Sequence, residues 1–224
     1  GATSDGHLWH TTRHTDSSWA AFADVEEVAG EKGTFRSVGA ASIAGELHVA
    51  GVTTDGHLWY TIRHADGSWS NFGDIEQAAG EQGIFIEVAI MNVNNELQLV
   101  GSISSGSIFH TIRHNNSNWD SLAVLIPWYW YYWGSSSKLS IAEINHELQV
   151  MITTNIGDLN YTSRYSDGNW DGLESNTQHG VSWYRWVISI SPRHRVRSAG
   201  RGPRSTPGGP SSSPRRDGRS PRND

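Results

Sequence analysis

The sequence predicts an all-β protein, a β-propeller built from four-stranded blades, and three observations predict it. The chain of 224 residues repeats itself at a period of about fifty residues. Each copy alternates apolar and polar residues with the period of two that marks a strand. The composition, with 11 Trp and 24 Gly beside only 2 Met, suits short strands and tight turns better than a helical bundle.

The repeat is clearest in a segment of about ten residues that ends in Arg-His or Arg-Tyr and occurs at 5–14, 55–64, 105–114 and 156–165. Each segment is followed by a tryptophan: Trp19, Trp69, Trp119 and Trp170. Several strands per unit at this period are typical of propeller blades, although a β-prism, a trefoil or another stacked array is an alternative. We expect repeat units at about 1–50, 51–100, 101–150 and 151–190.

The second copy shows how one blade is expected to form. A strand begins near Phe35 and turns at 44–45, and the next strand ends at Asp55-Gly56, a two-residue hairpin signal. The third strand covers 58–64, and a fourth lies around 69–75. Equivalent blades are expected at 85–126 and 136–175, whereas residues 1–30 supply only two outer strands. The Glu-rich stretches at 25–31 and 75–81 are expected to be short connectors.

Composition and charge narrow the class of protein. The chain has no cysteine and no apolar run long enough to span a bilayer, so we expect no disulfide and no membrane insertion. Residues 191–224 hold nine Arg and two Asp, a balance of +7, so residues 1–190 carry −6 minus 7, which is −13. An acidic body argues against nucleic acid as a partner. No signal peptide is visible, yet a secreted or cell-surface-directed protein is favoured.

Two segments depart from the repeat. The tail, 191–224, is rich in Arg, Pro, Ser and Gly and is expected to be disordered, and an out-of-frame reading of a longer gene would produce such a sequence. The aromatic run 127–133 replaces a polar connector; decay of the repeat is the preferred interpretation, and a membrane or partner anchor the alternative. Residues 181–190 are the candidate inner strand for the N-terminal half-blade.

The string Asp-Gly-His-Leu-Trp-Tyr-Thr-Ile-Arg-His-Ala-Asp-Gly-Ser-Trp at 55–69, followed by Phe72-Gly-Asp-Ile, resembles the seven-bladed β-propeller lectins of the Photorhabdus fucose-binding type. The resemblance covers residues 1 to about 175. It implies a closed ring that binds fucose and related or O-methylated sugars between neighbouring blades. This chain departs from the pattern, because it holds too few blades for such a ring.

A sugar site pairs a flat aromatic with side chains that hydrogen-bond two hydroxyls, and each copy supplies such residues. The predicted sugar-binding residues are Trp9, Arg13, His14, Trp19, Trp59, Arg63, His64, Trp69, Arg113 and Trp119. The tryptophans that close each copy are alternatively blade-to-blade packing residues. The arginines are alternatively ion-pair partners of the glutamates Glu46, Glu96 and Glu147.

The chemistry expected of the chain is binding. No cofactor and no metal are expected, because no carboxylate recurs beside the histidines in the sequence. Glycoside hydrolysis needs two carboxylates concentrated in one pocket, whereas the repeated glutamates are spread around a ring, so we expect no enzyme. A multivalent lectin with glycans as partners is the main hypothesis; a protein-interaction propeller and a sialidase-like glycosidase are the alternatives. A homo-oligomer that completes the ring is also considered.

Overall fold

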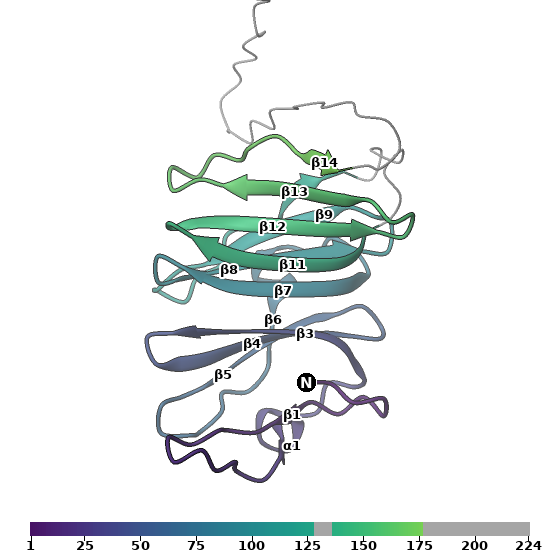
Figure 1. Ribbon diagram of the computed structural model, residues 1–224. Coiled ribbons are helices and arrows are strands. Elements are labelled where there is room, and N and C mark those ends of the chain that lie inside the picture. Colours follow the sequence, from purple (N-terminus) through teal and green to yellow (C-terminus); the bar gives the residue numbers. More distant parts are fainter. Residues whose placement is uncertain (128–135, 177–224) are drawn as a thin grey trace, which may run out of the picture. The chain divides into compact units, whose positions relative to one another are not determined.

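The computed structural model describes residues 1–127 and 136–176, and this part of the chain is all-β. It forms one two-stranded and three four-stranded antiparallel sheets (Figure 1). The N-terminal sheet pairs β1 (Trp9–His10) with β2 (Ala23–Asp24). The first full blade contains β3 (Phe35–Ile43), β4 (Glu46–Thr53), β5 (Leu58–Arg63) and β6 (Gly73–Asp74). The expected propeller blades are therefore confirmed.

The other two blades follow the same order along the chain. The second full blade contains β7 (Phe85–Val93), β8 (Glu96–Ile103), β9 (Ile108–Arg113) and β10 (Ala123–Ile126). The third contains β11 (Ser136–Ile144), β12 (Glu147–Thr154), β13 (Leu159–Arg164) and β14 (Glu174–Asn176). In each blade the strands are neighbours in sequence order, as in a meander. The half-blade at the N-terminus also agrees with the sequence.

Hairpin turns fix the register of the first two strands in every blade. The turn after β3 uses Ala44 and Gly45, with φ of 51° and 83°, and the turn after β7 uses Asn94 and Asn95, with φ of 54° and 65°. Two successive residues with positive φ favour the turn that matches the twist of a hairpin. The turn at 44–45 is the one that the sequence predicts, and the turn at 94–95 is its equivalent in the next blade.

A glycine in the second strand makes room for an aromatic ring from the first. A Cβ at Gly51 would lie 2.6 Å from the ring of Phe35, and one at Gly101 would lie 2.8 Å from that of Phe85. The first strand bulges beside this contact in the first two full blades, and β11 of the third blade has a register shift at the same place without the contact. The buried phenylalanine is the first residue of the first strand, so it packs at the end of the blade that follows the connector.

Two short helices replace the connectors expected at 25–31 and 75–81. Helix α1 (Val25–Ala29) follows β2, and helix α2 (Ile75–Ala79) follows β6. An aspartate caps each helix, and a glycine with positive φ ends it. The third copy has Ala-Val-Leu-Ile at the same place and continues as strand β10, because β-branched residues favour a strand and the capping aspartate is absent.

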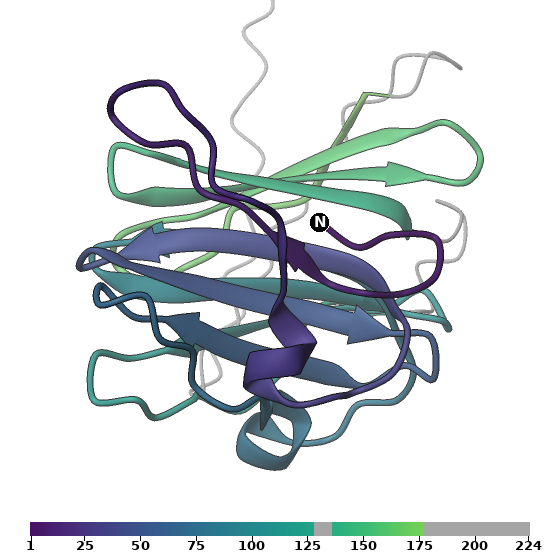
Figure 2. The same ribbon diagram turned by 90° about the horizontal axis from the view of Figure 1, so that it is seen from below.

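Each blade has two faces, because side chains alternate along a strand. In β5 the face formed by Leu58 and Tyr60 packs on the second full blade, within one core cluster; we call this face the front. The opposite face, with Trp59, packs in the cluster that includes Leu8 and Val25 of the N-terminal segment; we call this face the back. Figure 2 shows the N-terminal segment and α1 lying across the first full blade.

The described strands therefore form three junctions between successive sheets. The first junction joins the N-terminal sheet to the first full blade, the second joins the first and second full blades, and the third joins the second and third. The aromatic run 128–133, the candidate strand 181–190 and the tail 191–224 lie outside the described residues. In the described part, neither helix is long and apolar enough to cross a membrane.

Candidate functional site

One hairpin recurs in every unit, between the third strand and the fourth, and it places an arginine beside a tryptophan. Arg63 at the end of β5 pairs with Trp69 across the turn, as Arg164 at the end of β13 pairs with Trp170. The turn is held by an aspartate: Asp66 Oδ1 accepts a hydrogen bond from the backbone N–H of Ser68 at 2.9 Å. The equivalent hairpins at 13–19 and 113–119 have the same pairing.

The turn glycine leaves space for the guanidinium. A Cβ at Gly67 would lie 3.3 Å from Arg63 Nη2, and one at Gly168 would lie 3.2 Å from Arg164 Nη2. Both glycines have positive φ, so the turn itself also requires glycine. The arginine therefore lies against its own turn, on the back face beside the tryptophan.

Each of three tryptophans packs edge-on against a ring from the preceding unit. Trp69 contacts His10 with ring centroids 5.4 Å apart, and Trp119 contacts Tyr60 at 5.4 Å. Trp170 contacts His110 at 5.0 Å and is only 6% exposed. Such edge-to-face pairs contribute about 0.5–1.5 kcal/mol beyond their buried area. These tryptophans therefore join neighbouring blades, as one of the two interpretations from the sequence expects.

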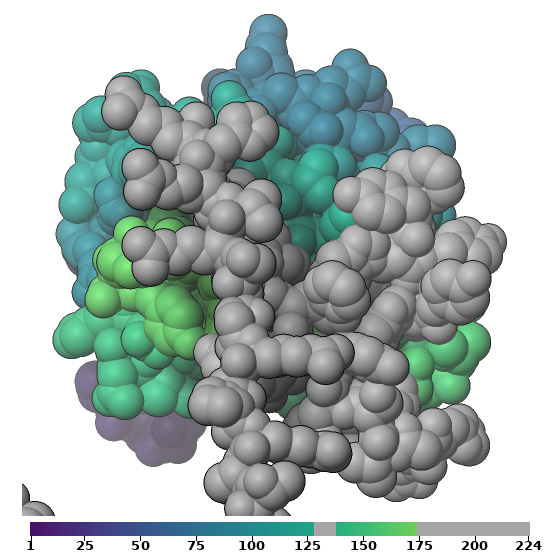
Figure 3. Space-filling model, turned by 90° about the horizontal axis from the view of Figure 1, so that it is seen from above, coloured from purple at the N-terminus to yellow at the C-terminus, as the bar shows by residue number. Residues whose placement is uncertain are grey.

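The third junction contains a hollow of about 150 Å³ beside this stack. Arg164, Gly168 and Trp170 of the third full blade line one side. The second full blade lines the other side, with His110, Thr111, Ile112, Asp120, Ser121 and Ala123. The two blades adjoin in the view from above, one teal and one green (Figure 3). An indole, a guanidinium, a carboxylate and hydroxyls thus converge on one small space.

Burial controls the protonation of the groups at this hollow. It lowers the pKa of His110 to about 3, with a further contribution from the charge of Arg164, so the imidazole is neutral at pH 7. His110 Nε2 donates to Gln98 Oε1 at 2.8 Å, since an amide oxygen only accepts. Burial also lowers the pKa of Arg164, and the nearby charges of Glu96 and Asp120 oppose that shift. The hollow therefore presents a partly desolvated cation.

A row of hydrogen-bonded titratable side chains, Glu96, His114 and Asp120, leads to the edge of the same hollow. His114 Nδ1 lies 2.7 Å from Glu96 Oε1, and its Nε2 lies 2.9 Å from Asp120 Oδ1. Hydrogen bonds to these two carboxylates raise the pKa of His114. The imidazole thus fixes the carboxylate of Asp120 at the edge of the space that Arg164 faces.

The other two junctions repeat this plan with different residues. The first junction has a hollow of about 120 Å³ lined mostly by apolar side chains, with His10 and Trp69 among them. At the second junction the guanidinium of Arg113 lies 5.0 Å from the centre of the Tyr60 ring. Burial raises the pKa of the Tyr60 hydroxyl, which hydrogen-bonds His48. The three junctions therefore differ in polarity.

The structure divides the predicted sugar-binding residues between two edges of the blade. We call the edge beside the helices α1 and α2 the helix edge, and the edge formed by the hairpins that pair an arginine with a tryptophan the hairpin edge. Trp59 and Arg63 share the back face but are four residues apart, which is about 13 Å along a strand. Trp59 lies at the helix edge, where Lys32 Nζ is 4.4 Å from the centre of its ring. Arg63 lies at the hairpin edge with Trp69. Trp9 and Arg13 are separated in the same way, so one small sugar does not span either pair.

The remaining predicted residues lie at the hairpin edge. By strand alternation His14 and His64 are on the front face, and His64 Nδ1 is 2.7 Å from Glu46 Oε1. Arg113 and Trp119 meet Tyr60 at the second junction. Arg13, His14 and Trp19 are exposed, and Trp19 retains 63% of its accessible surface. This last set has no described unit on its back face.

Two features differ from the interpretation of the sequence. The alternative in which the arginines form ion pairs with Glu46, Glu96 and Glu147 is wrong for the described residues, because no ion pair between them contains an arginine, and Glu46 and Glu96 instead bind His64 and His114. Sequence reasoning also missed the front-face residues at the stack, His10, Tyr60 and His110. The sequence did contain a sign of these residues, because three successive copies have an aromatic or imidazole ring at this position.

No family model and no curated protein matches the sequence. Solved structures match in fold. The BP39L lectin from Burkholderia pseudomallei has a TM-score of 0.63 at 18% identity over 78% of this chain and 50% of that one. The fucose-specific lectin from Aleuria aurantia has a TM-score of 0.52 at 12% identity, over 77% of this chain and 53% of that one.

The SapL1 lectin, solved with alpha methyl fucoside, has a TM-score of 0.50 at 11% identity over 83% of this chain and 74% of that one. The chain spans about half the length of the first two structures. The likeness establishes the fold of the described chain as that of part of a β-propeller.

Proposed function

We propose that this chain is a carbohydrate-binding protein without catalytic activity, a lectin that binds sugars at the junctions between blades. The observation that carries the proposal is the hollow at the third junction, which combines the indole of Trp170 with the guanidinium of Arg164 and the carboxylate of Asp120. An indole packs on the apolar face of a sugar ring, and the charged groups hydrogen-bond adjacent hydroxyls.

Fucose and its methylated relatives are the proposed ligands. The resemblance of the repeat to fucose-binding lectins supports this choice, and so does the fold, which is shared with a fucose-specific lectin and with a lectin solved with a methyl fucoside. The hollow of about 150 Å³ suits one monosaccharide better than a long oligosaccharide.

Several junctions in one chain would make binding multivalent. The first and second junctions repeat the arginine and the tryptophan, so we propose them as further sites of different strength. Weak sites on one molecule gain avidity on a surface coated with glycans.

An enzymatic role is less favoured than binding. The carboxylates Glu46 and Glu96, which recur in the repeat, are each held by a histidine at 2.7 Å. Asp120 is held by the same His114 as Glu96, which suits a fixed hydrogen-bond acceptor at a binding site. We therefore expect no turnover of a chromogenic fucoside.

A pair of matched arginine variants tests the proposal. Calorimetric titration of the full chain with methyl α-L-fucoside should show binding, and Arg164→Gln should remove one site from the stoichiometry. A hydrogen bond from a charged group contributes about 1.5–3 kcal/mol, so that site should weaken by at least about tenfold. Arg13→Gln changes the same repeat position on the open face and should leave the stoichiometry unchanged. An unchanged Arg164→Gln protein would contradict the assigned site.

The predicted homo-oligomer stays a prediction. Trp19 on the back face of the N-terminal sheet is 63% exposed, and Tyr161 on the front face of the third full blade is 37% exposed. Trp19 stands at the repeat position of Trp69, and Tyr161 stands at the repeat position of His10. The two exposed rings therefore correspond to the two partners of the stack between Trp69 and His10. A second copy would bring these halves together, and light scattering of the wild type and of Trp19→Ala measures whether it does.

A further inference from the structure

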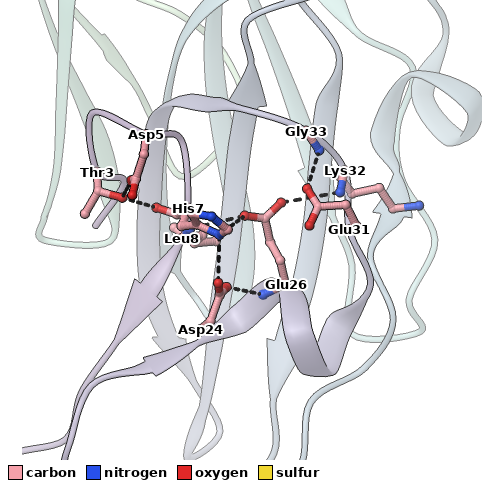
Figure 4. A network of polar contacts seen from close by, with 9 residues as sticks. All are labelled: Thr3, Asp5, His7, Leu8, Asp24, Glu26, Glu31, Lys32 and Gly33. Atoms are coloured by element: carbon pink, nitrogen blue, oxygen red, sulfur yellow. Dashed lines mark hydrogen bonds and ion pairs between the residues drawn. The ribbon is translucent and has the colours of Figure 1, made fainter.

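A second group of polar side chains lies at the helix edge, away from the hairpins that hold the proposed sugar sites. His7, in the turn before β1, lies between two carboxylates at the start of α1 (Figure 4). Its Nδ1 is 2.8 Å from Asp24 Oδ2 and 3.9 Å from Glu26 Oε2. The three residues each offer one ligand atom, and all these atoms lie within 4.8 Å of one another.

The local fold leaves these atoms directed at a common point. Asp24 caps α1 through Oδ1, which accepts from the backbone N–H of Glu26 at 2.9 Å, so Oδ2 is left for His7. This group could not be recognised from the sequence, because the two carboxylates come from a strand and a helix that lie well after the histidine in the chain. The expectation that no carboxylate recurs beside the histidines is therefore wrong, because His7, His57 and His64 each lie beside a carboxylate.

Glu26 is the most deeply buried member of the group, and its side chain also hydrogen-bonds that of Glu31. Its side chain is only 2% exposed, yet its two backbone hydrogen bonds are long, 3.3 Å from Leu8 N–H and 3.4 Å from Lys32 N–H. Hydrogen bonds of this kind are normally 2.7–3.2 Å, and a buried carboxylate needs strong partners. A cation beside Oε2 would satisfy it.

The spacing of the group suits a divalent transition metal. Zinc bonds to histidine nitrogen and carboxylate oxygen are about 2.0–2.2 Å long, so two ligands of a tetrahedral ion are about 3.4 Å apart. The separations of 2.8 Å and 3.9 Å lie on either side of this value. His7 is 47% exposed, which leaves an open side for water.

We propose that His7, Asp24 and Glu26 form a Zn²⁺ site with its fourth position open to water. The ion would fasten the N-terminal turn to the start of α1. An imidazole with two carboxylates favours Zn²⁺ over Ca²⁺, which prefers a shell of oxygens. The site needs no sugar and is independent of the proposed lectin function.

The second copy of the repeat supplies an internal control. His57 Nδ1 lies 3.4 Å from Glu76 Oε2, but Asp74 forms no ion pair with His57 among the described contacts. Asp74 Oδ1 instead accepts from the backbone N–H of Gln77 at 3.0 Å. Among the described residues, only the first copy brings three such ligands together. The third copy has Ser107, Val124 and Ile126 at these positions.

Calorimetric titration of the full chain with ZnCl₂ tests the proposal. The wild type should bind one ion, and His7→Asn should weaken that site by at least about tenfold, the scale of even second-shell changes at metal sites. His57→Asn should leave it unchanged. Glu26→Gln, which keeps the shape of the side chain, should also weaken binding while its circular dichroism matches the wild type. CaCl₂ should not displace the zinc.

Two results would overturn the zinc site. One is a wild-type protein that takes up no Zn²⁺ at pH 7.5. The other is an equal loss of binding in His7→Asn and His57→Asn, which would assign the zinc to exposed histidines in general. Neither result bears on the titration with methyl α-L-fucoside, so the two proposals fail separately.

Discussion

Arg164 with Trp170 and Arg13 with Trp19 occupy the same two positions of the repeat, yet their surroundings differ. Each arginine pairs with its tryptophan across the same turn. Trp170 packs on His110 and is 6% exposed, whereas Trp19 is 63% exposed. Arg164 lines a hollow that the second full blade completes, and Arg13 is exposed. One repeat therefore encodes half of the lining of this hollow, and the neighbouring blade supplies the other half.

The junctions differ from one another in their residues more than the repeats do, because each junction combines the back face of one unit with the front face of another. The back face contributes an arginine and a tryptophan in every copy, so it is nearly constant. The front face contributes His10, Tyr60 or His110, and it changes from one junction to the next. We therefore expect the front face to set the relative strength of the sites.

The largest expected effect comes from removing the two tryptophans in turn. Trp170→Ala deletes a buried ring between two blades and should lower the free energy of unfolding by about 3–5 kcal/mol. Trp19→Ala deletes an exposed ring and should change it by less than about 0.5 kcal/mol. Urea denaturation followed by circular dichroism measures both. Equal losses would show that Trp19 is also packed.

Acid should destabilise the third junction through His110. Its pKa is about 3 in the folded protein, below the ordinary value of 6.5, so the unfolded chain binds the proton more readily. Stability should fall as the pH drops below about 6.5, by on the order of 2 to 3 kcal/mol at pH 4.5. His110→Gln removes the titrating group, and comparison of the two unfolding curves between pH 7 and pH 4.5 isolates its contribution.

A wild type that loses no more stability than His110→Gln over this range would contradict the burial of His110. The first junction offers a weaker version of the same effect. Burial also lowers the pKa of His10, but this histidine is only half-buried, so His10→Gln should remove a smaller acid dependence.

His114 should show the opposite pH dependence, and the effect should be the smallest. Hydrogen bonds to Glu96 and Asp120 raise its folded pKa above 6.5, so its contribution to stability is complete below pH 6.5 and is lost as the pH rises through the folded pKa. His114→Asn should cost less than about 1 kcal/mol at pH 6, because the pairs are partly exposed. Thermal unfolding of the wild type and of His114→Asn at pH 6 and at pH 8 measures this dependence, and an equal difference between the two proteins at both pH values would contradict it.

Much of the fold could be predicted from the sequence, because its signals are local. Alternation places the strands, and the residue pairs at 44–45 and 94–95 mark the hairpins. The helices at 25–29 and 75–79 were missed because five residues are too short for a helical period. Their capping aspartates, Asp24 and Asp74, were the available sign.

The candidate site was harder to predict because two blades line its hollow. Pairing Trp59 with Arg63 treated one strand as the whole site, whereas the sheet places these residues at opposite edges. Position in one repeat tells which face a side chain takes, but it does not tell what the next blade presents there. For the same reason the convergence of His7 with Asp24 and Glu26 could not be seen in one strand.

A crystal structure of the full chain with methyl α-L-fucoside bound would show whether a sugar site is shared between two blades. We expect the sugar at the third junction, with its ring against Trp170 and its hydroxyls on Arg164 and Asp120. A sugar bound only at Arg13 and Trp19, where no described blade lies on the back face, would contradict the proposal that a site requires two blades.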